Sequence, residues 1–193
     1  MDLLIQTIRN YIPFSPADEA VAQKLFHRKE YKKGEHLLTF GEICRHLLFI
    51  ESGLVRYYLT KGGEDQTNYF NKEGDFVCYY PSFLPKKPSV VGIQALEDCV
   101  VWQISFDGLQ QFYKEVEYGE RFGRLGIEAV FVQVSAQIDS IYTDTPEWRY
   151  KNFLHNYSDI VQRIPQYYIA SYVGVKPQSL SRIRKRLSGS RGY

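Results

Sequence analysis

Four polar side chains near the carboxyl end of the chain have types and spacing suited to reading DNA base edges. They are Gln178, Ser179, Ser181 and Arg182. In the major groove, Gln forms paired hydrogen bonds with adenine and Arg forms them with guanine. Ser is small enough to let a helix approach the bases. We therefore expect Gln178 and Arg182 to read bases and the two Ser side chains to add auxiliary contacts.

Cations surround these four residues and suit the DNA backbone. They are Lys176, Arg184, Lys185 and Arg186. Contacts from such side chains to phosphate oxygens fix the register of a protein on DNA without reading sequence. Over residues 147–193, nine Lys and Arg residues oppose two acidic residues, a net charge of +7, whereas the whole chain carries +2. A basic end on an acidic body favours a polyanion partner, and a solvated basic helix is the alternative.

The pattern around these side chains predicts the element that must position them. Residues 166–185 have the features of a helix-turn-helix, in which two short helices are joined by a tight turn. Ala170 is small where the helices approach, and Gly174 permits the positive φ that ends the first helix. Pro177 fits the first turn of the second helix. The inward apolar positions are Ile169, Val173, Leu180, Ile183 and Leu187. A helical hairpin in a protein-binding module is the alternative.

The region from Tyr31 to about residue 104 has the pattern of a β-domain. Short apolar runs are separated by glycine-containing turns at spacings of roughly 8–12 residues, which is typical of an all-β barrel or sandwich. The expected strands include residues 46–50, 54–59, 67–70, 89–93 and 100–104. Before them, residues 1 to about 30 are predicted to be helical, with Ser15 as a helix cap.

A long helix is predicted after the β-domain, over about residues 108–142, and it carries two apolar stripes. One stripe comprises Leu125, Ala129, Val132 and Ala136. The other comprises Ile127, Phe131, Val134, Ile138 and Ile141. A helix with two apolar faces must cover both, and steps of three and four residues suit a dimer seam. We predict a dimerisation helix with the first stripe as the candidate seam. Either stripe could form it, and a helix enclosed within one domain is the alternative.

A break separates this helix from the helix-turn-helix. Thr145 is a plausible cap and Pro146 fits the first position of a new helix. The domain boundary is therefore predicted near residue 143. Residues 1–143 would form a sensor domain that includes the dimerisation helix, and residues 144–193 would form the DNA-binding domain.

The chain as a whole resembles the Crp/Fnr family of bacterial transcription regulators, over about residues 15–187. The resemblance rests on Lys33-Gly34-Glu35, Phe40-Gly41-Glu42, residues 50–56, Glu73-Gly74-Asp75-Phe76, residues 169–175 and Ser181-Arg182-Ile183. It implies an α+β fold. A double-stranded β-roll of the cyclic nucleotide-binding type, jelly-roll-like and cupin-like, would have flanking helices and be followed by a dimer helix. A C-terminal all-α helix-turn-helix domain would then bind a palindromic site as a two-fold pair. Residues 188–193 are too few for the winged hairpin common in the family, so we expect the wing to be absent.

The sequence departs from the family pattern in the sensor. Cyclic-nucleotide binders place a Gly-Glu after the Gly-Asp-Phe turn, and an Arg followed by Ser or Thr further on. Here Tyr79 stands at the Glu position and Ser89 at the Arg position. We predict a degenerate effector pocket around Tyr79, Tyr80, Ser89 and Val90, and we do not expect cyclic AMP to bind. The effector is unknown, no cofactor is expected, and Lys86 and Lys87 are interpreted as a solvated loop.

Other chemistries have little support in the sequence. The three cysteines, Cys44, Cys78 and Cys99, are far apart, which argues against a disulfide framework or an iron–sulfur cluster. The four histidines have no metal-ligand spacing, so no metal site is expected. Cys78 lies beside two Tyr residues and could be redox-active, but a buried inert thiol is the preferred interpretation. No signal peptide or membrane span is recognised, and a reduced, cytoplasmic location is the simplest expectation.

These patterns together predict a homodimeric, sequence-specific transcription regulator. Its expected partners are double-stranded DNA and a second copy of the chain, with RNA polymerase as a further candidate. The alternative is a ligand-binding or scaffolding module whose basic helical tail binds a protein. An enzyme is the weakest hypothesis, because we recognise no nucleophile–base arrangement and no phosphate-cradling glycine motif.

Overall fold

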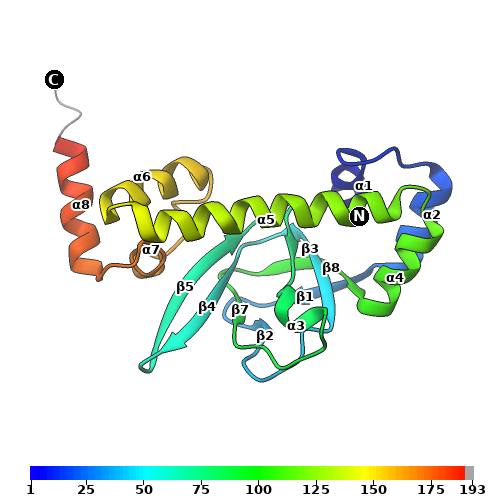
Figure 1. Cartoon of the computed structure of the whole chain (residues 1–193), viewed down its shortest axis with the longest axis horizontal. Coiled ribbons are helices and arrows are strands. Elements are labelled where there is room, and N and C mark those ends of the chain that lie inside the picture. Colours follow the sequence, from blue (N-terminus) through cyan, green and yellow to red (C-terminus); the bar gives the residue numbers. More distant parts are fainter. Residues whose placement is uncertain (190–193) are drawn as a thin grey trace. The chain divides into compact units, whose positions relative to one another are not determined.

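The computed structural model describes residues 1–189, and its elements are labelled in Figure 1. The helices are α1 (Asp2–Arg9), α2 (Pro16–Leu25), α3 (Tyr80–Phe83), α4 (Phe106–Glu115), α5 (Gly119–Thr143), α6 (Pro146–Asn156), α7 (Gln166–Val173) and α8 (Pro177–Gly189). The strands are β1 (His27–Tyr31), β2 (His36–Leu38), β3 (His46–Ser52), β4 (Val55–Lys61), β5 (Glu64–Asn71), β6 (Phe76–Val77), β7 (Gly92–Ala95) and β8 (Cys99–Ser105). No helix in the described range is long and apolar enough to cross a membrane.

The strands form two four-stranded sheets, with the orders β1-β8-β3-β6 and β2-β7-β4-β5. In the first sheet, β1 runs antiparallel to β8 and pairs His27 with Gln103, while β3 pairs Leu48 with Val77 of β6. The α+β fold and the double-stranded β-roll with flanking helices are therefore confirmed. Residues 190–193, the last part of the segment on which the missing wing was predicted, lie outside the described range.

The amino-terminal helical prediction was correct in part. Ser15 caps α2: its hydroxyl oxygen accepts from the Asp18 amide at 3.2 Å, and the Ser15 amide donates to the Asp18 carboxylate at 2.9 Å. The helix ends at Leu25, however, and after Phe26 the five residues His27–Tyr31 form β1. The prediction of helix to about residue 30 was wrong. The residues of β1 are mostly polar and exposed, and they form a strand because their backbone pairs with β8.

Contacts divide the chain into two units. The first unit comprises Met1–Tyr57 and Phe70–Val132. The second comprises Tyr58–Tyr69 together with the chain from Gln133 onward. The outer part of the β4–β5 hairpin therefore belongs with the helices that follow α5, and the division falls within α5 itself. The domain boundary near residue 143 stays a prediction.

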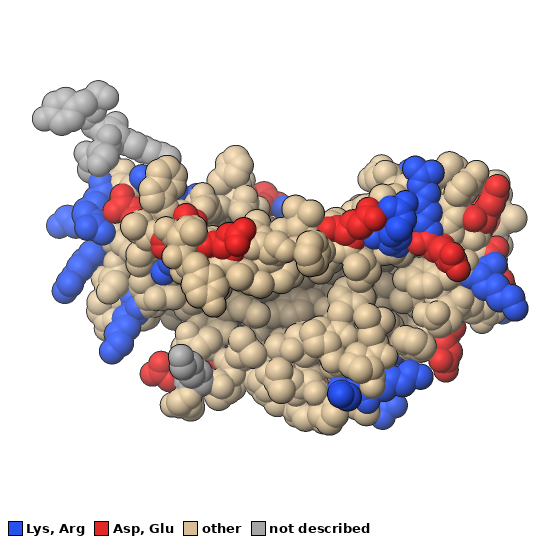
Figure 2. All heavy atoms as spheres, in the orientation of Figure 1, with Lys and Arg blue, Asp and Glu red and all other residues tan. Residues whose placement is uncertain are grey.

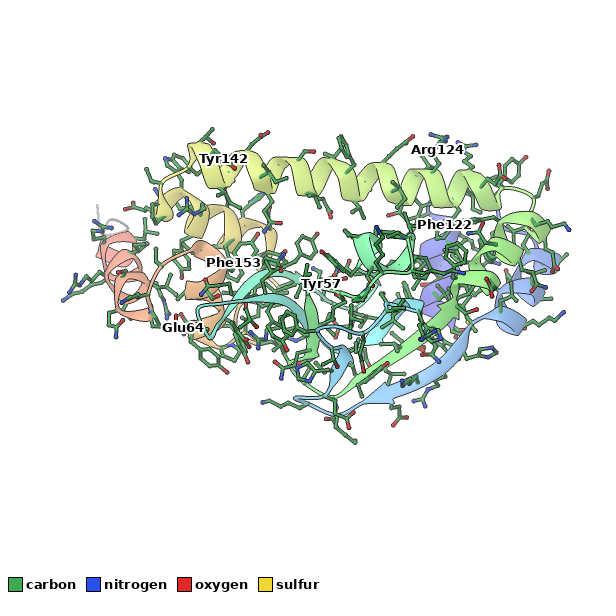
Figure 3. The ribbon with its side chains drawn as sticks, turned by 60° about the horizontal axis from the view of Figure 1, so that its bottom comes forward. Tyr57, Glu64, Phe122, Arg124, Tyr142 and Phe153 are labelled. Atoms are coloured by element: carbon green, nitrogen blue, oxygen red, sulfur yellow. The ribbon has the colours of Figure 1, made fainter. Side chains whose placement is uncertain are left out.

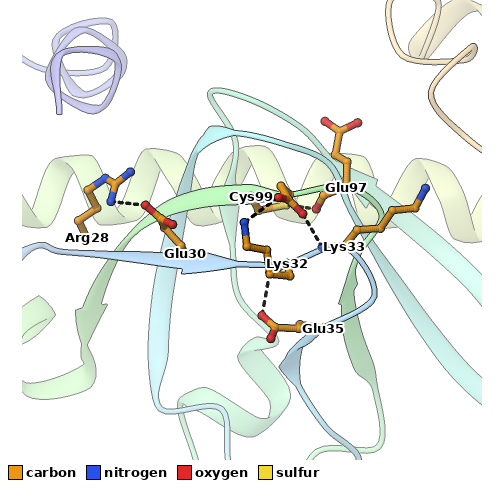
Figure 4. Close-up of polar contacts among 8 residues, drawn as sticks. Arg28, Glu30, Lys32, Lys33, Glu35, Glu97 and Cys99 are labelled. Atoms are coloured by element: carbon orange, nitrogen blue, oxygen red, sulfur yellow. Dashed lines mark hydrogen bonds and ion pairs between the residues drawn. The ribbon is translucent and has the colours of Figure 1, made fainter.

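Acidic side chains tie the β1–β2 turn of the first unit to the start of β8 (Figure 4). Asp98 accepts from the Lys32 ammonium and from the Lys33 amide, each at 2.9 Å. The Lys32 amide donates to the Glu35 carboxylate at 2.7 Å. The hydrogen bond from Lys32 lowers the pKa of Asp98 below its usual value, and the hydrogen bond from the Lys33 amide adds to this effect. The two bonds to Asp98 link the β1–β2 turn to the residue that precedes β8.

The helical stretch predicted over about residues 108–142 is two helices, and the prediction of one continuous helix was wrong. Val116 ends α4 because its backbone angles are extended (φ −86°, ψ 129°). Its side chain is buried. A Cβ on Gly119 would lie 2.7 Å from the Phe112 carbonyl oxygen and 2.8 Å from Tyr113 Cα. Only glycine can begin α5 so close to the backbone of α4.

Candidate nucleic-acid interface

Helices α6, α7 and α8 form the helical body of the second unit around an aromatic core. Thr145 caps α6 by accepting from the Trp148 amide at 3.3 Å. Phe153 of α6, labelled in Figure 3, is fully buried. Its ring centroid lies 5.1 Å from that of Tyr157 and 5.3 Å from that of Tyr172 on α7. This core holds α7 against α6 and so orients the helix pair that follows.

The turn between α7 and α8 has the geometry that its glycine predicts. Gly174 has φ 77° and ψ 35°, the left-handed conformation, and ends α7. The Val175 amide donates to the Ala170 carbonyl at 2.9 Å, which satisfies one of the last carbonyls of the helix. Pro177 then begins α8. Four of the five predicted inward positions, Ile169, Val173, Leu180 and Ile183, are buried, and Leu187 is partly exposed.

Arg149 is a positioning residue that the sequence-based prediction missed. Its Nε donates to the Val173 carbonyl at 2.8 Å, and its Nη1 donates to the Asp144 carbonyl at 2.6 Å. The side chain thereby joins the start of α6 to the last residue of α7. In the sequence, Arg149 was counted only as one charge of a basic segment.

The predicted base-reading residues lie on the exposed part of α8. Gln178, Ser181 and Arg182 are exposed, and Ser179 is partly exposed. Spacings of three and four residues put Gln178, Ser181 and Arg182 on one helical face, and Lys185 continues it one turn later. Arg182 makes no hydrogen bond or ion pair with any residue that the structure describes. Its guanidinium therefore has its donors available for a ligand.

The predicted phosphate-binding cations are all exposed, and Figure 2 shows Lys and Arg side chains gathered over α8. They differ in their partners. Arg184 donates to the Gln166 side chain on α7 at 2.5 Å, and Arg186 lies 3.4 Å from the Glu147 carboxylate on α6. These contacts orient two of the cations, while Lys176 lies in the turn before α8.

A groove of about 930 Å³ runs between the start of α6 and α8. Its lining residues are Thr145, Pro146, Glu147, Val175, Ser179, Arg182, Ile183, Lys185 and Arg186. Two predicted base-reading residues and two predicted phosphate-binding residues therefore share one concave surface. The second unit thus presents a basic helix beside a groove.

The hairpin part of the second unit contacts α7 and α5, and no sequence motif predicts these contacts. The Thr67 amide donates to Ser171 Oγ at 2.8 Å, and the same hydroxyl donates to the Asp65 carbonyl at 3.4 Å. Tyr69 donates from its hydroxyl to the Gln133 side chain at 2.6 Å. The first helix of the helix pair is therefore bonded directly to β5.

Helix α5 exposes most of its apolar side chains. In the predicted seam, Val132 is 66% exposed, Ala129 and Ala136 are exposed, and Leu125 is partly exposed. In the other stripe, exposure ranges from 41% at Ile127 to 71% at Phe131. Along the 25 residues of α5, only Gly119 and Phe122 are buried. Within the described chain, neither stripe is covered.

The four predicted effector-pocket residues have separate environments. Tyr79 and Tyr80 are partly exposed at the start of α3, and burial raises the pKa of Tyr80. Ser89 is buried, and its hydroxyl donates to the Val91 carbonyl at 2.7 Å. Val90 is 62% exposed. Lys86 and Lys87 are exposed, as predicted, and the Lys86 ammonium lies 4.5 Å from the centre of the Phe106 ring. Ser89 therefore has a structural role in its own loop.

Comparison with known proteins agrees with this architecture. The family model described as the cyclic nucleotide-binding domain matches residues 28–116. None of the curated proteins matches the chain significantly.

Solved structures share the fold over most of the chain. FixK2 from Bradyrhizobium japonicum is 17% identical with a TM-score of 0.72, covering 86% of each chain. A CooA mutant from Carboxydothermus hydrogenoformans is 18% identical with a TM-score of 0.73, covering 98% of this chain and 86% of the other. A cyclic nucleotide-binding domain containing protein from Listeria monocytogenes is 18% identical with a TM-score of 0.72, covering 98% and 90%. FixK2 and CooA are Crp/Fnr regulators.

Proposed function

We propose that the chain is a homodimeric, sequence-specific DNA-binding transcription regulator. The proposal starts from the match of residues 28–116 to the cyclic nucleotide-binding domain model and from the fold that the chain shares with Crp/Fnr regulators. The observation that carries the proposal is the way in which the structure presents α8. It follows a left-handed glycine turn, buries Leu180 and Ile183, and exposes Gln178 and Arg182 on its outer face. A helix presented in this way enters the major groove in helix-turn-helix proteins.

In this proposal, different side chains in and around α8 contact the DNA bases and the DNA phosphates. Gln178 and Arg182 read base edges, and Ser179 and Ser181 add close contacts. Lys176, Arg184, Lys185 and Arg186 bind phosphate oxygens. The bond of Arg184 to Gln166 supports this role, because it holds a cation at the α7 side of the reading face. Since DNA is the partner, the protein would act in the compartment that holds the chromosome, the cytoplasm of a bacterium.

The salt dependence of binding tests the DNA partner. Each phosphate contact releases condensed counterions, so the logarithm of the binding constant should fall steeply and linearly with the logarithm of salt concentration. We expect Lys185→Ala to weaken binding about equally on all DNA sequences and to reduce this slope by roughly 1. Fluorescence anisotropy with labelled duplexes measures both. A salt-independent affinity, or an unchanged slope in the variant, would favour a protein partner for the basic helix.

We propose that α5 forms the dimer interface, with Leu125, Ala129, Val132 and Ala136 as the seam. The support is a 25-residue helix whose apolar side chains lie exposed to water, since exposed apolar patches of this kind mark association surfaces. Small side chains in the seam would let two helices approach closely. The exposed stripe that contains Phe131 is the competing seam.

Sedimentation velocity of two charge variants distinguishes the stripes. Val132→Asp should give monomers, because burying an unpaired carboxylate at an interface is costly. Phe131→Asp should leave the dimer intact, because Phe131 lies in the other stripe. The reverse result would assign the seam to the Phe131 stripe. A dimer that survives both substitutions would contradict an α5 interface.

We also propose that the effector pocket is degenerate and does not bind cyclic AMP. The support is Ser89, which stands where the family's Arg is expected and is bonded to its own loop. A neutral hydroxyl cannot supply the charge-assisted hydrogen bonds that hold a cyclic phosphate. Isothermal titration should show no binding of cyclic AMP or cyclic GMP. Micromolar binding of either nucleotide would contradict this part of the proposal.

A further inference from the structure

Two cysteines that are distant in sequence meet in the first unit. Cys44 lies in the loop between β2 and β3, and Cys78 directly follows β6. Their sulfur atoms are 4.0 Å apart, and both are free thiols. Cys44 and Cys78 are 34 positions apart, so the contact comes from the pairing of β3 with β6.

The fold holds both cysteine backbones in place. The Cys44 amide donates to Ser82 Oγ at 2.9 Å, and Ser82 is fully buried in α3. The Cys78 amide donates to the hydroxyl of Tyr57 at 3.0 Å, and Tyr57 is labelled in Figure 3. The sulfur atoms therefore face each other through anchored backbones. A disulfide has an S–S length of about 2.05 Å, so the sulfurs must approach by roughly 2 Å. Rotation of the two side chains about their Cα–Cβ bonds can supply this movement while the backbone hydrogen bonds remain.

The two thiols have opposite electrostatic environments. A hydrogen bond from the Cys78 thiol lowers the pKa of Cys44 to about 7. Burial opposes this shift, and backbone hydrogen bonds at Tyr79 and His46 add to it. Burial, and then the neighbouring Cys44 sulfur, raise the pKa of Cys78 well above its usual value. These opposite directions favour Cys44 as the sulfur that loses its proton first as the pH rises. A thiolate beside a protonated thiol is the arrangement of an attacking and a resolving cysteine.

Cys44 lies in the wall of a cavity, although only 7% of the residue is exposed. A cavity of about 510 Å³ in the first unit is lined by Cys44 and by the neighbouring Arg45 and His46, with Lys29 and Val77 also in its wall. The third cysteine differs in its surroundings. Cys99 is buried, its thiol bonds to the Glu97 carbonyl at 3.2 Å, and its pKa is raised to about 11, chiefly by burial.

We propose that Cys44 and Cys78 form a site of reversible oxidation, at which a hydroperoxide converts the thiol pair into an intramolecular disulfide. The Cys44 thiolate attacks the peroxide O–O bond and becomes a sulfenic acid, and the departing alkoxide or hydroxide takes up a proton. The Cys78 sulfur then attacks the sulfenic sulfur, forming the S–S bond, while the S–O bond breaks and water leaves with the Cys78 proton. Overall, two thiols lose two electrons and two protons, and the hydroperoxide becomes an alcohol, or water, plus water.

This disulfide would act on the segment that holds the predicted effector residues. Cys78 immediately precedes Tyr79 and Tyr80, and Cys44 is bonded to Ser82 of α3. Ser82 also donates to the Lys87 carbonyl at 2.5 Å. Closing the S–S bond would therefore join the β2–β3 loop covalently to the residue that precedes Tyr79. A transient disulfide of this kind is the form expected in a reducing compartment.

Mass spectrometry of the full-length chain tests the site. The reduced protein is exposed to one equivalent of hydrogen peroxide, denatured, and alkylated with N-ethylmaleimide. We expect adducts per chain to fall from three to one, with the loss of two hydrogen masses. A non-reducing tryptic digest should contain peptide 34–45 linked to peptide 73–86. Dithiothreitol should restore three adducts. Three adducts after peroxide, a link to Cys99, or a link between chains would overturn the proposal.

Serine variants separate the roles of the two sulfurs. Cys99→Ser is the matched control and should still lose two adducts. In Cys78→Ser, oxidation should stop at a Cys44 sulfenic acid that dimedone traps. In Cys44→Ser, peroxide should leave Cys78 as a thiol. Circular dichroism of each variant confirms folding, and the tryptic linkage in the wild type remains decisive if one variant does not fold. Dimedone trapping at Cys78 in Cys44→Ser, at the rate seen for Cys44 in Cys78→Ser, would contradict the assignment of Cys44 as the attacking sulfur.

Discussion

Replacement of Arg182 by alanine removes the base contact on which the proposed function most depends. Arg182 is exposed and has no partner among the described residues, so the substitution should change the free energy of unfolding by no more than about 0.5 kcal/mol. A bidentate Arg–guanine contact contributes about 1–3 kcal/mol of discrimination. At about 1.4 kcal/mol per tenfold, each half-site should lose about 5- to 140-fold in affinity. The loss should appear on the cognate base pair and vanish on DNA that already lacks it.

Fluorescence anisotropy on the cognate duplex and on duplexes with each alternative base pair measures this effect. Arg28→Ala is the matched control, because Arg28 lies in the first unit and its ion pair with Glu30 is exposed. The control should bind all duplexes as the wild type does. If Arg182→Ala kept both the affinity and the base preference of the wild type, the assignment of α8 as the reading helix would be refuted.

Three further substitutions or treatments test separate parts of the structure. Phe153→Ala should lower the free energy of unfolding by about 3–5 kcal/mol, because the ring is fully buried, and a denaturant titration in which it cost under 1 kcal/mol would contradict this core. Gly174→Ala should cost roughly 1–2 kcal/mol through its left-handed conformation, measured as a lower thermal midpoint of the helical unit, and an unchanged midpoint would argue against the turn. The rate of Cys44 alkylation by iodoacetamide should rise with pH through about 7, since only the thiolate reacts. Alkylation of Cys99 should stay slow until near pH 11, and a midpoint near pH 9 for Cys44 would contradict its low pKa.

The helix-turn-helix could be predicted from the sequence because its signals are local. Ala170, Gly174 and Pro177 lie within one short segment, and each has a conformational or steric role that does not depend on distant residues. The capping of α2 by Ser15 was predictable for the same reason. The roles of Gln178 and Arg182 remain predictions, although both side chains are exposed as their roles require.

The features that escaped prediction depend on contacts between distant parts of the chain. β1 has no apolar alternation and becomes a strand only by pairing with β8, whose partner residues lie 68 to 76 positions away. The break before α5 arises from the close approach of Gly119 to the α4 backbone. The bond from Thr67 to Ser171 spans 104 positions. Cys44 and Cys78 appeared isolated in the sequence for the same reason, and the structure places their sulfur atoms 4.0 Å apart.

Selection of bound duplexes from a random DNA pool, with the purified full-length chain, tests the central claim most directly. A homodimer that reads DNA through α8 should enrich one two-fold symmetric sequence, with half-site centres about 10–10.5 base pairs apart, or a multiple of one helical turn. The Arg182→Ala variant should enrich the same motif with one base position relaxed in each half-site. Recovery of sequences with no enriched motif would contradict the account, because binding would then be electrostatic and without sequence preference.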